Sequence, residues 1–162
     1  MKMRDELGEI VEREDVKYLI GYQKGSHGFR VTPIFAEKKE DVKKLIFSPL
    51  CVNNLVSYLV LEDKPPLPRG EEADRRKVAV LVKGCDSRAI VQLMVENGIE
   101  REDVIVIGIP CSGVVDTEKL DEIFPDVLEG DVIDEGDHFR VIYDGKEEKV
   151  PKEELLAEKC KS

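Results

Sequence analysis

The stretch over residues 77–110 constrains the fold of this chain most, because two unbroken apolar runs enclose a segment of helical period. The runs are "VAVLV", which ends at Val82, and "VIVIGI", which ends at Ile109. Continuous β-branched runs are typical of strands that are covered on both faces. Between the runs, Ile90 and Met94 lie at the spacing of one helix face. A strand, a helix and a strand within roughly thirty residues predict a βαβ unit with two parallel strands.

Shorter elements are predicted on either side of this unit. Two strands around a glycine-rich connector are predicted before it, and small antiparallel strands with a turn at Asp144 and Gly145 after it. The fold class is therefore α/β, with a βαβ core of parallel strands and small antiparallel hairpins at both ends, in a single domain over residues 1–162. A proline-rich, charged surface loop is expected over residues 62–77. The predicted strands cover residues 16–24, 29–37 and 132–151, and the predicted short helices cover residues 40–48, 51–61, 116–124 and 152–160.

Composition excludes several classes of protein. The net charge of −10 argues against nucleic-acid binding, which needs a basic surface. No stretch reaches the length of a membrane span, and the N-terminus lacks the apolar run of a signal peptide, so we expect a cytoplasmic location. The four cysteines form no C-x-x-C pair, so no complete zinc or cluster motif is present. They are Cys51, Cys85, Cys111 and Cys160.

Two loops leave the carboxyl ends of the predicted parallel strands, which is where ligands bind in open parallel sheets. Both loops should emerge at the same edge of the sheet, and this convergence distinguishes their cysteines from ordinary buried thiols. The candidate cofactor-binding residues are Lys83, Gly84, Cys85, Asp86, Ser87 and Arg88 in the first loop, and Pro110, Cys111, Ser112 and Gly113 in the second.

Cys85 has a physical reason to be functional, because it lies at the start of the predicted helix. Unpaired backbone N–H groups and the helix dipole favour an anion there, and Lys83 and Arg88 add positive charge that favours a thiolate. The same features suit a phosphate or a flavin pyrophosphate, with Gly84 permitting close approach of the backbone. The alternative is structural: Asp86 caps the helix and pairs with Arg88, and Cys85 fills a small buried space.

The remaining candidates carry weaker signals. Asn53 and Asn54 cap a helix, satisfy a buried backbone group or face a ligand, and the sequence does not choose between these roles. Neither His27 nor His138 has a motif that ties it to a cysteine, so a Cys–His hydrolase is disfavoured. The sequence contains neither a G-x-G-x-x-G fingerprint nor a Walker A loop.

Three stretches together resemble a known family. They are "CVNNLVSYL", "VAVLVKGCDSRAIVQLMVENGIEREDVIVIGIPCSGVVD" and the closing "LLAEKCKS". They are similar to the N-terminal portion of the beta subunits of coenzyme F-420-reducing hydrogenase and F-420-dependent formate dehydrogenase, which are iron–sulfur flavoproteins. The resemblance implies an electron-transfer module with FAD and [4Fe–4S] clusters. It further implies coenzyme F-420 as a substrate and a hydrogenase, formate dehydrogenase or ferredoxin-like redox partner.

Cys160 in "EKCKS" resembles the opening of a group of cluster ligands, with no second cysteine after it. The resemblance therefore implies Cys160 as a metal ligand in an incomplete motif. Either the chain is truncated before the rest of the group, or it is a stand-alone relative that has lost its clusters. Two other functions stay open: a non-catalytic docking domain of a redox complex, and a thiol-based enzyme that uses Cys85.

Overall fold

The computed structural model describes residues 2–60, 69–70, 72 and 74–161, and most of the predicted loop over 62–77 lies outside these described residues. The chain divides into two compact units, and each unit is assembled from three separate segments. The first unit contains residues 1–21, 33–44 and 54–110, and the second contains residues 22–32, 45–53 and 111–162. The single domain over residues 1–162 stays a prediction.

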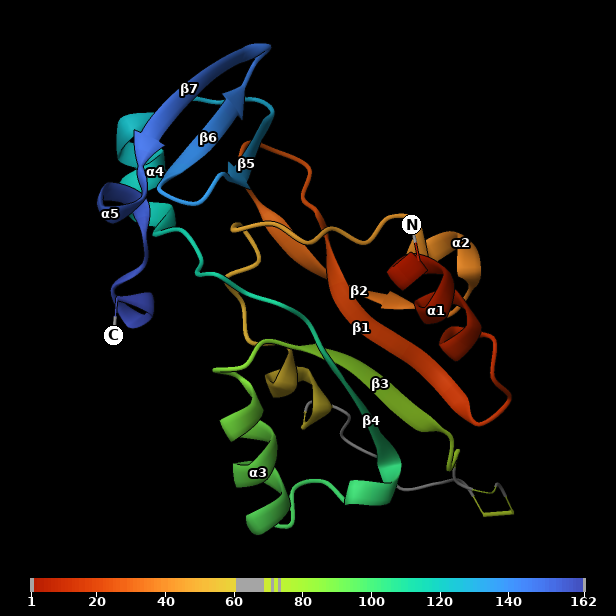
Figure 1. Ribbon diagram of the computed structural model, residues 1–162. Coiled ribbons are helices and arrows are strands. Elements are labelled where there is room, and N and C mark those ends of the chain that lie inside the picture. The colour runs from red at the N-terminus through yellow and green to blue at the C-terminus, as the bar shows by residue number, and fades with distance from the viewer. Residues whose placement is uncertain (1, 61–68, 71, 73, 162) are drawn as a thin grey trace. The chain divides into compact units, whose positions relative to one another are not determined.

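A four-stranded sheet holds the predicted βαβ unit (Figure 1). The strand order is β2-β1-β3-β4, and β3 pairs in parallel with both β1 and β4. All residues of β3 except the first are buried, which confirms the prediction of a strand covered on both faces. The bounds are β1 Val16–Lys24, β2 Val31–Ala36, β3 Lys77–Val82 and β4 Val104–Gly108.

The crossover helix α3, Ser87–Val95, joins β3 to β4 as predicted. It ends where Asn97 takes a left-handed conformation with φ 56 and the N–H of Gly98 donates to the carbonyl of Leu93 over 2.8 Å. This is the hydrogen bond of a Schellman cap, with asparagine rather than glycine in the left-handed position. Ile90 is the one residue of α3 that is buried.

The second unit is built around a three-stranded antiparallel sheet in the order β5-β6-β7 (Figure 1). Its β6–β7 turn has Asp144 at φ 45 and Gly145 at φ 78, which confirms the predicted hairpin. The core of this unit includes Phe29, Val132 and Phe139. The elements are β5 Gly130–Asp134, β6 His138–Tyr143, β7 Lys146–Pro151, α4 Thr117–Ile123, α5 Lys152–Leu155 and the 3-10 helix Glu158–Cys160.

Three predicted helices are shorter than expected. The helix over 40–48 is only α2, Lys39–Val42, because the following backbone bonds to a strand: Ile46 donates to the carbonyl of Tyr22 over 2.9 Å. Over residues 51–60, the described part of the predicted helix 51–61, the structure has only a 3-10 helix, Leu55–Leu59. The last helix breaks after α5, because Leu156 is extended and forms a β-bridge with Val115.

Two helices of the described residues were not predicted: α1, Lys2–Val11, which buries Leu7 and Val11, and the short 3-10 helix Arg101–Asp103. Across the part of the chain that the structure describes, no helix combines the length and the apolar character needed to cross a bilayer.

Candidate functional site

The first candidate loop leaves β3 at the edge where β4 also ends. Val82 lies opposite Gly108 in the parallel ladder, and the N–H of Ile109 donates to the carbonyl of Val82 over 2.9 Å. The strands that precede the two candidate loops are parallel and end at the same edge of the sheet, as predicted, and the structure shows that they are direct neighbours.

Lys83 is the buried charge of this loop. Only 2% of its surface is exposed, and its ammonium lies 3.0 Å from the carboxylate of Asp86. A buried ammonium is costly unless it is paired, so this ion pair fixes where both side chains point. Lys83 is consequently part of the support of the loop, and Asp86 offsets the positive charge that Lys83 was expected to lend to Cys85.

The backbone of this loop is tightly bonded to itself. The carbonyl of Lys83 accepts from the N–H groups of Asp86 and Ser87 over 3.0 and 3.2 Å, and the hydroxyl of Ser87 donates to the carbonyl of Gly84 over 2.6 Å. Cys85 is exposed on the outside of this turn, with its Sγ 3.7 Å from Asp86 Oδ1. A short, internally bonded turn presents the Cys85 thiol at the start of α3.

The structural alternative for this loop disagrees with the geometry. Asp86 occupies the N-cap position of α3, but its side chain makes no capping hydrogen bond, and its ion pair goes to Lys83 instead of Arg88. Cys85 is exposed and does not fill a buried space. A Cβ added at Gly84 would meet no atom within 4 Å, so this exposed backbone is open to a neighbouring group.

The second candidate loop begins with Pro110 at the end of the first unit and continues through Cys111, Ser112 and Gly113 in the second. Cys111 is exposed, and the hydroxyl of Ser112 donates to the carboxylate of Asp134. The meeting of Cys85 with Cys111 stays a prediction, because the two cysteines belong to different units.

Three segments that carry cysteines run together within the second unit. Val115 donates to the carbonyl of Pro49 over 3.0 Å, two residues from Cys51. A Cβ added at Gly113 would lie 3.7 Å from the Cβ of Cys160. Cys51 is buried and Cys160 is partly exposed. Sequence reasoning did not predict this grouping, because it depends on pairing between distant segments.

The structure gives two of the weaker candidates structural roles. Asn54 caps the 3-10 helix by accepting from the N–H of Val56 over 3.0 Å. The carbonyl of Asn53 accepts from the hydroxyl of the fully buried Tyr22 over 2.5 Å. The contact of Asn54 matches the capping role that the sequence left open, whereas the contact of Asn53 uses its backbone carbonyl and leaves the role of its side chain open.

His138 lies between two carboxylates. Its Nδ1 is 2.6 Å from Asp137, and its Nε2 is 2.6 Å from Glu135. The hydrogen bonds to Asp137 and then to Glu135 raise the pKa of His138 above its ordinary value. This histidine belongs to a surface ion-pair network.

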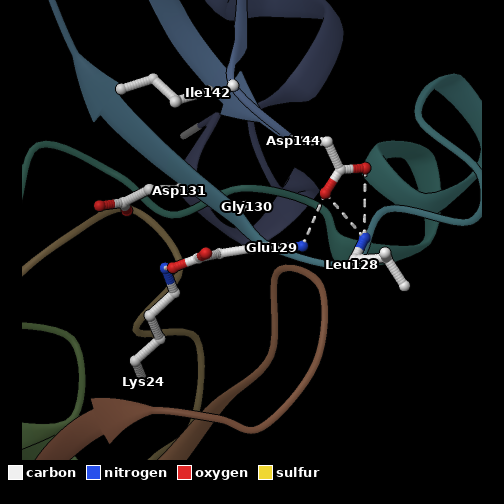
Figure 2. A pocket seen from close by; sticks show the side chains of 8 residues that line it. Lys24, Leu128, Glu129, Gly130, Asp131, Ile142 and Asp144 are labelled. Carbon is white, nitrogen blue, oxygen red and sulfur yellow. Dashed lines mark hydrogen bonds and ion pairs between the residues drawn. The ribbon is translucent and has the colours of Figure 1, made fainter.

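A hollow of about 570 Å³ lies beside β5 (Figure 2). Its charged groups serve the fold: the Asp144 carboxylate accepts from the N–H groups of Leu128 and Glu129, and Lys24 pairs with Glu129 over 2.9 Å. None of the predicted site residues lines this hollow. The lining residues are Lys24, Leu128, Glu129, Gly130, Asp131, Ile142, Asp144 and Gly145.

The described residues contain no group of three His, Cys, Asp or Glu side chains that can hold a metal ion. Within the second unit, Cys51, Cys111 and Cys160 therefore do not form such a group.

The fold is that of a mixed α/β protein, and its two candidate loops follow the carboxyl ends of the neighbouring parallel strands β3 and β4. No family model matches the chain. It is 27% identical over 153 residues to F420-dependent formate dehydrogenase 1 subunit beta of Methanococcus maripaludis. This match covers 90% of the chain and 37% of that protein, and it confirms the predicted resemblance.

A solved structure shares the fold. It is a chain of the F420-reducing [NiFe] hydrogenase complex of Methanosarcina barkeri, with a TM-score of 0.68 and 18% sequence identity. The likeness covers 98% of the chain studied and 57% of the hydrogenase chain. In both comparisons, the chain spans less than two thirds of its relative.

Proposed function

We propose that this chain is a domain or subunit of a flavin- and iron–sulfur-dependent oxidoreductase in anaerobic electron transfer, with coenzyme F-420 as a substrate. The observation that carries the proposal is the sequence similarity to a formate dehydrogenase beta subunit over 90% of the chain. Because only a tenth of the chain lies outside that match, both candidate loops fall within it.

One observation of the structure supports FAD binding at the first loop. The space at Gly84, beside the start of α3, is open. Backbone N–H groups at a helix start suit a pyrophosphate, and a glycine lets the backbone approach it closely. When bound, the flavin would supply the redox chemistry. The chain's own residues would hold and orient it, with the Lys83–Asp86 pair keeping the turn rigid and Arg88 adding positive charge.

A [4Fe–4S] cluster does not fit the described cysteines alone, because such a cluster takes four ligands and no group of three is present among them. Cys160 would supply a single ligand to a cluster whose other ligands lie elsewhere.

Anaerobic reconstitution with FAD tests the proposal. After gel filtration, the chain should retain a flavin absorption band, and Gly84→Val should lose it because the added side chain fills the open space. The matched control is Val91→Ser, which alters an exposed residue of α3 away from its start and should keep the flavin. A wild-type chain that emerges colourless contradicts flavin binding.

A redox partner subunit is the second part of the proposal. The solved relative is a chain of a hydrogenase complex, and α3 exposes Val91 at 60% and Val95 at 72%. Exposed apolar side chains on one helix favour a surface that another protein covers. The double variant Val91→Ser, Val95→Ser should reduce retention of a formate dehydrogenase catalytic subunit in a pull-down, and unchanged retention contradicts this role of α3.

A thiol-based enzyme is a second candidate, favoured by the exposure of Cys85 at the start of α3. Iodoacetamide labelling of Cys85 as a function of pH tests it. An apparent pKa near that of free cysteine, about 8.5, contradicts an activated nucleophile.

A further inference from the structure

Asp134 and Lys152, which are not among the candidate site residues, form a polar cluster with Ser112 of the second candidate loop. The carboxylate of Asp134 accepts from the hydroxyl of Ser112 and from the N–H of Gly136, and it lies 2.6 Å from the ammonium of Lys152. The side chains of Asp134 and Lys152 are 16% and 17% exposed, so water screens their interaction only in part. Lys152 also lies 5.4 Å from the ring centre of Phe139, which adds a cation–π contact.

This cluster holds the loop that presents Cys111. Ser112, the next residue, is tied to β5 through Asp134. Gly113 has φ 121 and packs so closely on Leu156 that a Cβ there would lie 2.5 Å from a side-chain carbon. Ala157 then donates to the carbonyl of Val114 over 2.9 Å. The loop is therefore fixed at Ser112 by Asp134 and beyond it by the C-terminal segment.

Asp134 is not the base of a serine nucleophile. Burial works to raise its pKa, but the hydrogen bonds from Lys152, Ser112 and Gly136 outweigh burial, and the net pKa lies below the ordinary value. A carboxylate with a lowered pKa is a poor acceptor for the proton of an alcohol. The same bonds are suited to anchoring a loop and to balancing the charge of Lys152.

We propose that Asp134 is a positioning residue for the Cys111 thiol. It anchors Ser112 and balances the charge of Lys152, so that the loop is fixed and the thiol meets no net positive charge from this cluster. The inference rests on the proposed function in one respect, which is that the loop over 110–113 lines the cofactor site.

Three other lysines on the neighbouring segments are already paired or bonded. Lys119 lies 3.9 Å from Asp116 and 3.6 Å from Glu158, and Lys161 lies 2.6 Å from Glu158. Lys159 donates to the carbonyl of Val52 over 3.3 Å. The variants below leave these groups unchanged, so differences between the variants report on Asp134 and Lys152.

The decisive test compares the charge variants Asp134→Asn and Lys152→Met in the cofactor-free chain. Iodoacetamide labelling at pH 7, followed by peptide mass spectrometry, gives the rate at Cys111 and, as an internal reference, at Cys85. Asp134→Asn should speed labelling of Cys111 by about threefold, because it leaves Lys152 unbalanced, and Lys152→Met should slow it by a similar factor. Cys85 should label at the wild-type rate in both variants.

A merely structural role predicts a different result, because loosening of the loop moves both variants in the same direction. A shift of the same sign, or no shift in either variant, overturns the proposal. Since no flavin is present in this test, its failure is separate from a failure of flavin binding.

Amide exchange tests the anchoring of the loop with variants that change no charge. Ser112→Ala should speed exchange of the Val115 and Asp116 amides, which donate to the carbonyls of Pro49 and Leu155, by about tenfold, since it removes a hydrogen bond to a charged group that holds the preceding loop. Ser112→Thr retains the hydroxyl and should restore the wild-type rate. The matched control is Tyr143→Phe, which removes the 3.3 Å hydroxyl–carboxylate bond to Glu148 in the same unit and should leave this exchange unchanged. Wild-type exchange in Ser112→Ala overturns the anchoring role.

Discussion

Two lysine–aspartate pairs support the two candidate loops, and they are built differently. Lys83 and Asp86 are three residues apart and lie 3.0 Å from each other within one turn. Lys152 and Asp134 come from α5 and β5, 18 residues apart, and lie 2.6 Å from each other. The first pair is nearly closed to water, at 2% and 12% exposure, and the second is more open, at 17% and 16%. A local pair gives rigidity to its own turn, whereas the distant pair joins α5 to β5, and Ser112 of the second loop is bonded to the Asp134 of that pair.

The largest effect is expected for Asp86→Asn, which leaves the buried ammonium of Lys83 without its countercharge. We expect the free energy of unfolding to fall by about 3–5 kcal/mol, measured by urea denaturation. Asp15→Asn is the matched control, because its pair with Arg13 has side chains 46% and 49% exposed. That variant should cost much less than Asp86→Asn, because water screens an exposed pair. Equal losses in the two variants would contradict the burial argument.

Lys152→Met should have a smaller effect than Asp86→Asn. The carboxylate of Asp134 keeps the donors Ser112 and Gly136 and some contact with water, so the free energy of unfolding should fall by about 2 kcal/mol. Urea denaturation measures this change as well. A loss larger than that of Asp86→Asn would contradict the expectation that the more buried pair contributes more to stability.

Acid should weaken the Asp134 pair selectively. Its pKa is lower in the folded chain than in the unfolded chain, so its contribution to stability is complete above the unfolded value of about 3.9 and is lost as the pH falls through the folded value. The difference in melting temperature between wild type and Lys152→Met should therefore shrink below about pH 4. A difference that stays constant to lower pH would contradict this linkage.

The smallest effect is expected at His138, whose pKa is raised by Asp137 and Glu135. Its contribution is present below the unfolded value of about 6.5 and is lost as the pH rises through the higher folded value. The melting temperature of wild type should therefore fall slightly relative to that of His138→Gln above about pH 6.5, as measured by calorimetry. A relative rise would show that the histidine network does not favour the charged form.

The βαβ unit was predictable because its signal is local. The apolar runs of β3 and β4 and the helical spacing of α3 lie in one continuous stretch, and parallel pairing follows from the connection between them. The predicted helix over residues 40–48 is cut short for a physical reason. Leu45 pairs with Gln23 on a distant segment, and this pairing outweighs helical spacing.

The candidate site was predictable only in part, for the same reason. The loop after β3 follows directly from the sequence, but the charge balance of Lys83 by Asp86 depends on how the turn closes. The bond from Ser112 to Asp134 crosses 22 residues and depends on the position of β5. No spacing rule in the sequence connects two such residues, so Asp134 was not a candidate.

The interleaving of the two units has a consequence for synthesis on the ribosome. All segments of the first unit are available once residue 110 has emerged, whereas the second needs residues 22–32 and 45–53 to wait for residues 111–162. Phe29 and Leu50 therefore lack most of their apolar neighbours during much of translation. A deletion that removes residues 111–162 would leave these two side chains without most of their core. Because each unit consists of three separate segments, neither corresponds to one continuous stretch of the gene.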